Sequence, residues 1–230
     1  MNSTDFNSSI RSVFYFLKEA NLIRSHTTLS TLTVTSEFCE LSLTHDISYK
    51  TLFLCGLRNK DFNYLLTDYS YFQFTYKNKN NYRLAYYPNP LANSINHAQE
   101  LDEFLTEGII DFEEYSSLIS EVSYEITKPM IRFELDRDAY IRLSHPSAHF
   151  HIGMHTENRW PVNRYLTPHI FTLLIIKLYY SNEWANGLTS KTKNDFQNKY
   201  DLSIINEKLN CKLLDETMFH NTEKSQLYFT

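Results

Sequence analysis

The chain has 230 residues, a formal net charge of −5 and 42% hydrophobic residues. It is therefore long enough to bury a core without a disulfide or metal staple. The acidic balance argues against a protein that coats nucleic acid through a basic surface. Its three cysteines, Cys39, Cys55 and Cys211, lie far apart in the sequence and exclude a zinc ribbon or a disulfide framework.

The first half of the chain alternates between helical and extended patterns. Apolar residues at three- and four-residue spacing predict a helix over Ser3–Leu22. The Thr- and Ser-rich segment Leu32–Thr44 predicts a strand, whereas Tyr49–Leu57 fits a buried strand or a short helix. Alternation over Tyr71–Tyr87 predicts a β-hairpin whose tip is the Lys- and Asn-rich segment Lys77–Asn81.

Capping residues predict two helices in the middle of the chain. Asn93 or Ser94 can begin the first, and Asp111 with Glu114 forms a start like a capping box for the second. Two short helices are expected within residues 191–230.

Two strands and one buried helix follow Pro129. Alternation predicts strands over Ile131–Asp136 and Ala148–Met154. Thr167 as N-cap and Pro168 at the first helical position begin a helix that is apolar on nearly every face. The elements together predict an α+β fold: an antiparallel sheet with helices packed on one side, a long N-terminal helix and a buried helix after residue 167.

Membrane and export signals are missing from the sequence. The most apolar stretch, Ile170 to Tyr180, is about half as long as a membrane-spanning helix. The N-terminus carries Asp5 and Glu19 and has no continuous apolar core, which argues against a signal peptide. We therefore expect a cytoplasmic protein with no membrane contact and, since no linker or repeat divides it, one domain over residues 1–230.

Histidines concentrate in the second half of the chain: five of the nine lie between His145 and His169. In a strand, alternation places His149 and His151 on one face. The same rule turns the polar residues of the preceding strand away from the core. Antiparallel pairing of the two strands would bring these residues together, with His145 in a loop beside them. The candidate catalytic residues are His145, His149, His151, Arg132 and Asp136, and the candidate binding residues are Arg159, Glu134 and His155.

Three interpretations of this cluster stay open. The imidazoles could act as general acid and base on a phosphodiester, with Arg132 or Arg159 stabilising the negative charge. His149, His151 and a carboxylate could hold zinc or iron. The cluster could also be structural, with the arginine paired to carboxylates and the imidazoles bonded to loop backbone. No cofactor is required by the sequence, and a divalent metal is compatible with it.

The sequence supports neither a phosphate-loop nucleotide-binding protein nor a hydrolase with a catalytic triad. A Gly-rich phosphate loop is absent, and no serine or cysteine lies in a nucleophile elbow. Arg159 has few carboxylates around it, which fits an anion-binding residue or an ordinary surface arginine.

The motif order resembles that of a bacterial protein family of unknown function. The resemblance rests on Arg-x-Glu-x-Asp at 132–136, His-Pro-x-x-His-x-His-Ile-Gly at 145–153, Arg-x-Pro at 159–161 and Thr-Pro at 167–168. It covers about residues 132–180, and the chain departs from it at Trp160. The resemblance implies a bacterial cytosolic protein linked to mobile or defence gene clusters, and it implies no activity.

Two classes of function follow from these observations, with a sensor as a third. The first is a nuclease that cleaves RNA or DNA with the histidine cluster. The second is a non-catalytic partner, such as an antitoxin, an immunity protein or an adaptor of a defence complex, which suits the acidic charge and the aromatic content. A nucleotide-binding sensor is the third. The expected partner is nucleic acid or a protein from the same gene cluster.

Overall fold

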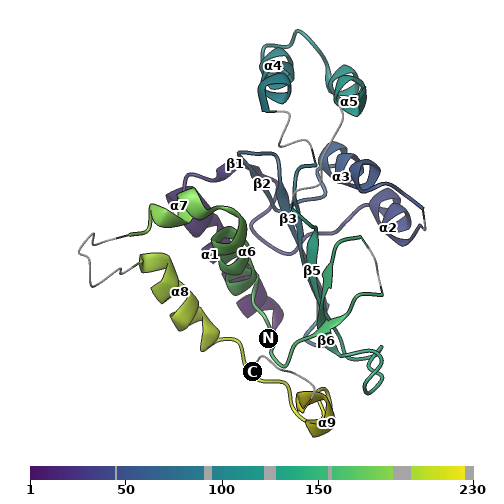
Figure 1. Cartoon of the computed structure of the whole chain (residues 1–230), viewed down its shortest axis with the longest axis vertical. Coiled ribbons are helices and arrows are strands. Elements are labelled where there is room, and N and C mark those ends of the chain that lie inside the picture. Colours follow the sequence, from purple (N-terminus) through teal and green to yellow (C-terminus); the bar gives the residue numbers. More distant parts are fainter. Residues whose placement is uncertain (45, 91–94, 122–127, 155–156, 189–197, 226–230) are drawn as a thin grey trace.

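In the computed structural model, an antiparallel sheet lies at the centre of the molecule, between helices (Figure 1). The structure describes residues 1–44, 46–90, 95–121, 128–154, 157–188 and 198–225. Within these residues the sheet has seven strands, which follow chain order from one edge to the other. They are β1 (Ile23–His26), β2 (Tyr64–Leu66), β3 (Tyr71–Asn78), β4 (Asn81–Tyr87), β5 (Ile131–Asp136), β6 (Ala148–Ile152) and β7 (Trp160–Pro161). The predicted α+β class with an antiparallel sheet is confirmed.

Helices surround this sheet (Figure 1). They are α1 (Ser3–Glu19), α2 (Ser36–Leu43), α3 (Tyr49–Arg58), α4 (Ile95–Thr106), α5 (Phe112–Glu121), α6 (Pro168–Tyr179), α7 (Ser181–Ala185), α8 (Lys199–Lys208) and α9 (Asn221–Lys224). The long N-terminal helix begins where Asn2 accepts the backbone N–H of Asp5 at 2.8 Å. None of the described helices is long and apolar enough to cross a membrane.

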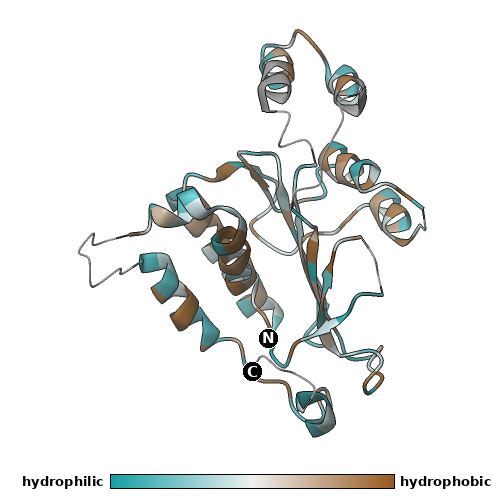
Figure 2. Ribbon diagram, in the orientation of Figure 1, coloured by the Kyte–Doolittle hydropathy of each residue, from teal (hydrophilic) through white to brown (hydrophobic). Residues whose placement is uncertain are grey.

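The main core lies between one face of the sheet and the helices α1 and α6. Alternating residues of β3, β4 and β5 point into it, among them Phe72, Leu84 and Phe133, which are all fully buried. Phe6 of α1 and Phe171 of α6 pack against this layer. Figure 2 shows α6 as an apolar ribbon, in agreement with the helix predicted to be buried.

The opposite face carries a second core under α2 and α3. Tyr71 and Tyr87 point to this side and pack on Phe38 and Phe53. Helices therefore pack against both faces of the sheet, whereas the sequence predicted helices on one face only. The reason is local: the strand predicted over Leu32–Thr44 is wrong, because its second half forms α2.

The start of α2 shows why that segment is helical. The hydroxyl of Thr35 accepts the backbone N–H of Phe38 at 3.4 Å and donates to Asp61 at 2.6 Å. The threonine that favoured a strand is in fact an N-cap. Tyr49–Leu57, which the sequence left open, is the helix α3 and is capped in the same way by Ser48.

Several predicted elements match the structure closely. β5 has the predicted bounds, and the hairpin of β3 and β4 turns at residues 79–80, inside the predicted tip. Asp111 and Glu114 form the expected reciprocal bonds, at 2.8 and 3.2 Å. The positions proposed to cap α4, 93 and 94, lie outside the described residues. The strands β1, β2 and β7 and the helix α7 were not predicted.

Candidate functional site

Polar side chains gather on the face of β4, β5 and β6 that points away from the main core. Alternation along β5 sends Ile131, Phe133 and Leu135 into that core and leaves Arg132 and Glu134 on the other side. The register pairs Arg132 with His151 and Glu134 with His149, so the two strands lie side by side as the sequence predicted. On its other side Glu134 is paired with Arg83 of β4.

The two histidines of β6 contact each other directly. His149 Nε2 lies 3.0 Å from His151 Nε2, and both side chains are almost fully buried. His149 Nδ1 donates to the carbonyl of Pro146 at 2.7 Å. Since a carbonyl only accepts, the proton of neutral His149 lies on Nδ1, and its Nε2 carries a lone pair. This lone pair faces the ring of His151.

Glu134 separates the arginines from the imidazoles. Its Oε1 faces Arg83 Nε at 3.0 Å and Arg132 Nε at 3.5 Å, whereas its Oε2 faces His151 Nε2 at 3.6 Å. Burial alone would raise the pKa of Glu134. The contact with His151 and the charges of Arg83 and Arg132 outweigh burial and hold this pKa well below its usual range. The carboxylate is therefore ionised at neutral pH.

His149 and His145 are held in the neutral form. Burial lowers the pKa of His149 to about 4, because the bond to Pro146 and the charge of Glu134 only partly offset the loss of water. Burial also lowers the pKa of His145, and the positive charge of Arg159 lowers it further. At neutral pH these two rings are therefore bases or ligands and not cations.

His145 and Arg159 extend the cluster beyond the strands. The ring centroid of His145 lies 5.2 Å from that of His149, edge to face. Arg159 immediately precedes β7, whose Pro161 is paired with His149. We call Arg83, Arg132, Glu134, His145, His149, His151 and Arg159 the histidine patch.

Unpaired polar atoms concentrate in the histidine patch. In the described part of the chain, six buried side-chain nitrogen or oxygen atoms have no hydrogen-bond partner, and four belong to this patch. They are Arg132 Nε, His145 Nδ1, His151 Nδ1 and Arg159 Nε. Arg132 Nε still has an ion-pair contact, because Glu134 Oε1 lies 3.5 Å from it. Buried polar atoms in folded proteins are nearly always paired, so such a cluster indicates groups that a ligand would satisfy.

A metal ion is one ligand that the patch could hold. One donor atom each of Glu134, His149 and His151 lies within 4.8 Å of the other two. Two imidazole nitrogens and a carboxylate oxygen are ligands that zinc and related ions accept.

Two predicted site residues stand apart from this group. Asp136 ends β5, and its Oδ1 accepts the backbone N–H groups of Asp138 and Ala139 at 3.1 and 3.2 Å. It shapes the turn after the strand, and its catalytic role stays a prediction. His155 lies outside the described residues.

Arg83 is the residue that sequence reasoning missed. Alternation with Leu84 indicated that Arg83 faces away from the core, but only the pairing of β4 with β5 brings it to Glu134. More than forty residues separate these strands, and nothing in the sequence signals their register.

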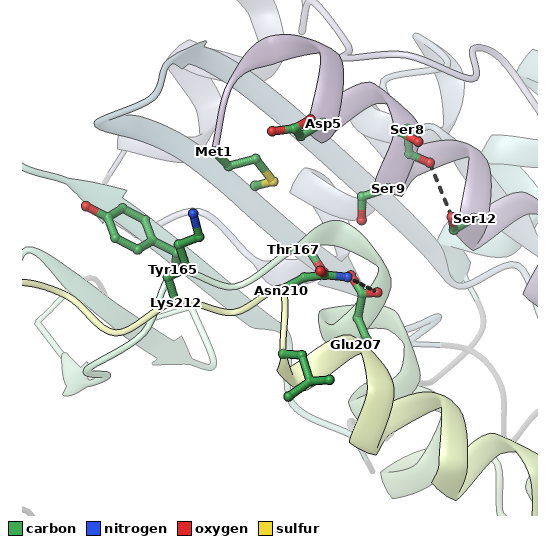
Figure 3. A pocket seen from close by; sticks show the side chains of 11 residues that line it. Met1, Asp5, Ser8, Ser9, Ser12, Tyr165, Thr167, Glu207, Asn210 and Lys212 are labelled. Carbon is green, nitrogen blue, oxygen red and sulfur yellow. Dashed lines mark hydrogen bonds between the residues drawn. The ribbon is translucent and has the colours of Figure 1, made fainter.

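A large cavity lies elsewhere in the molecule, between α1 and the end of α8 (Figure 3). It measures about 610 Å³, and no residue of the histidine patch lines it. Its buried polar groups satisfy each other: Thr167 and Asn210 donate to Glu207 at 2.6 and 3.0 Å, and Ser9 accepts the N–H of His169 at 2.9 Å. The histidine patch is therefore the better candidate site.

Comparison with protein families finds a match over most of the chain. The model of a family described as "Uncharacterized conserved protein (DUF2290)" matches residues 17–215, which include the whole histidine patch. This match extends well beyond residues 132–180, to which the sequence limited the resemblance. No curated protein and no solved structure matches the chain.

Proposed function

Since the chain belongs to the DUF2290 family of uncharacterized conserved proteins, whose description names no activity, we propose a function from the histidine patch alone: it cleaves phosphodiester bonds of nucleic acid. The observation that carries this proposal is a group of four buried nitrogen atoms that make no hydrogen bond, two on guanidinium groups and two on imidazoles. Guanidinium groups are positively charged, and their N–H donors are spaced to bind two oxygens of a phosphate group.

The chemistry assigns roles to His145, Arg132 and Arg159. A water molecule attacks phosphorus, so that a new P–O bond forms and the bond to the leaving oxygen breaks. His145 Nδ1, which has no partner among the described residues, accepts the proton of the water and returns it to the leaving oxygen. Arg132 and Arg159 stabilise the charge that develops on the phosphoryl oxygens.

The acidic chain as a whole does not contradict a nucleic-acid substrate. Three arginines, Arg83, Arg132 and Arg159, belong to the patch, whereas Glu134 is its one carboxylate. A local excess of positive charge is enough to attract a single phosphate group. The bacterial, defence-linked setting that the motif resemblance implies fits this proposal, as does a nucleic-acid partner.

The test is a cleavage assay on labelled single- and double-stranded RNA and DNA. We expect the wild-type chain to cleave at least one of the four, and His145→Ala to lose about 10²–10⁴-fold, the contribution typical of a general acid–base residue. Arg159→Ala should weaken cleavage by about 10²–10³-fold, as the loss of a transition-state donor does. His169→Gln, outside the patch, is the control and should cleave like the wild type.

Failure of this assay has a clear meaning. If the wild type cleaves none of the four substrates, or if His145→Ala cleaves at the wild-type rate, the proposal is wrong. The unpaired guanidinium atoms also favour a nucleotide-binding sensor. That second function is supported if nucleoside phosphates bind to the wild type, and not to Arg159→Ala, without being cleaved.

A further inference from the structure

We propose that Glu134, His149 and His151 bind one divalent metal ion of the zinc class, through Glu134 Oε2 and the Nε2 atoms of the two histidines. The inference deepens the proposed function and rests on it only for the role of the ion, not for the ion's presence. The donors come from adjacent strands, β5 and β6, whose register fixes Glu134 opposite His149.

The tautomer of His149 is the one that a metal ligand needs. Its Nδ1 donates to the carbonyl of Pro146 at 2.7 Å, so its Nε2 offers a lone pair. Ligating histidines are typically held in this manner, with the second ring nitrogen bonded to a backbone carbonyl or a carboxylate. The ring of His149 is therefore oriented before any ion arrives.

The separations of the donor atoms fit one ion. The two Nε2 atoms lie 3.0 Å apart, and His151 Nε2 lies 3.6 Å from Glu134 Oε2. Zinc bound tetrahedrally, with bonds near 2.1 Å, places its ligand atoms about 3.4 Å from each other. The two separations given above deviate from this value by only a few tenths of an ångström, and all three donor atoms lie within 4.8 Å of one another.

The contact between the two imidazoles needs either a proton or a metal ion at the two Nε2 atoms. Two lone pairs cannot face each other at 3.0 Å, so without an ion one Nε2 must carry a proton. A metal ion replaces that proton and lets both rings bind as neutral ligands, the form that metal binding requires.

Glu134 is arranged as the third ligand. Arg83 and Arg132 face its Oε1, which leaves Oε2 on the side of the imidazoles. Ligating carboxylates are commonly held by such outer contacts. Because Mg²⁺ and Ca²⁺ prefer ligand sets made of oxygen, the two nitrogens favour zinc or a related transition metal.

Three protein ligands leave the fourth position of a zinc ion to water. Such a site is of the catalytic kind, in which bound water loses its proton near neutral pH. His145, whose ring contacts that of His149, is placed to accept this proton.

The test is zinc binding by the full chain. After removal of metal with a chelator, calorimetric titration with ZnCl₂ should give one equivalent bound. His149→Gln and His151→Gln should each weaken binding by at least about 100-fold, since loss of an outer-shell partner alone costs about 10–100-fold. His169→Gln removes a histidine outside the site and should leave the titration unchanged.

Histidine NMR of the wild type provides a second measurement that needs no variant. Zinc should shift the Nε2 resonances of His149 and His151 and leave that of His169 in place. The inference is overturned if the stripped chain binds less than one equivalent, if both variants bind zinc as tightly as the wild type, or if the Nε2 resonances do not move. Zinc binding without cleavage of nucleic acid would retain the metal site and refute the proposed function. If the chain binds no zinc but still cleaves nucleic acid after metal is removed, the proposed function stands and the metal site is refuted.

Discussion

His149 and Glu134 face each other across adjacent strands, and together with His151 they form a buried group of two imidazoles and one carboxylate. Two of the three have support from outside the group: a backbone carbonyl for His149, and two arginines for Glu134. The proposed metal site depends on this arrangement, which in turn depends on the register of β5 and β6. The proposed cleavage depends on Arg132, His145 and Arg159 beside it.

Arg83 should contribute measurable stability, because it pairs with a carboxylate that is mostly buried. Arg83→Ala leaves Glu134 without its contact at 3.0 Å. We expect urea unfolding to show a loss of about 1–3 kcal/mol in the free energy of unfolding, between the values for exposed and buried pairs. Lys177→Ala removes the exposed pair with Asp201 and should cost less than about 1 kcal/mol. Equal losses in the two variants would show that Arg83 is no more than a surface residue.

Asp136 should act mainly through the turn that follows β5. Its Oδ1 accepts two backbone N–H groups, so Asp136→Ala should lower the free energy of unfolding by about 1–2 kcal/mol. Asp136→Asn keeps an oxygen acceptor in place and should stay within about 0.5 kcal/mol of the wild type. Thermal unfolding of both variants measures the difference. Comparable destabilisation by alanine and asparagine would contradict the assigned role.

Glu207 predicts a dependence of stability on pH. Burial opposes its ionisation, but bonds from His169, Thr167 and Asn210 lower the pKa of Glu207 below its ordinary value of 4.5. A carboxyl group with a lowered pKa stabilises the fold above its unfolded pKa, and this contribution is lost as pH falls through the folded value.

The variant Glu207→Gln tests this sign. At neutral pH it should be less stable than the wild type by about 1–2 kcal/mol, the contribution of hydrogen bonds to a charged group. The difference should shrink once the pH falls below about 4.5. Exposed Glu40→Gln is the control and should show no such trend. A Glu207→Gln deficit that is the same at low and neutral pH would rule the explanation out.

Gly56 should tolerate no side chain, because α3 packs there against β3. A Cβ atom at this position would overlap the hydroxyl of Tyr71 and lie 2.8 Å from Phe38 Cε2. Gly56→Ala should therefore destabilise the chain by about 1–3 kcal/mol. Adding Tyr71→Phe removes the overlapping oxygen, so the double variant should be more stable than the sum of the two single losses predicts. Strict additivity would mean that the clash is relieved in another way.

Much of the fold could be predicted, because local pattern and tertiary role agree in most elements. β5 alternates cleanly, and the Thr167–Pro168 pair marks the start of α6. The strand predicted over Leu32–Thr44 is wrong because threonine is common in strands but also caps helices. The contact of Thr35 with Asp61 decides for the helix cap. The short strands β1, β2 and β7 have no alternating pattern of their own, and they are extended because they pair with neighbouring strands.

The site was partly predictable for a similar reason. Alternation and the short connection from β5 to β6 correctly brought Arg132, Glu134, His149 and His151 together. Placing Arg83 in the site needs the pairing of β4 with β5, two strands that are distant in the sequence. The direct contact between the two imidazoles is seen only at the level of atoms. Residue spacing predicts neither contact.

The most direct test of the account is to locate a bound phosphate analogue in a crystal structure. A crystal structure of the zinc-treated chain soaked with thiophosphate should show the anion within hydrogen-bond distance of Arg132 Nε and Arg159 Nε, with His145 Nδ1 facing it. The account is contradicted if the anion lies elsewhere and His145 Nδ1 and Arg159 Nε are hydrogen-bonded to the protein.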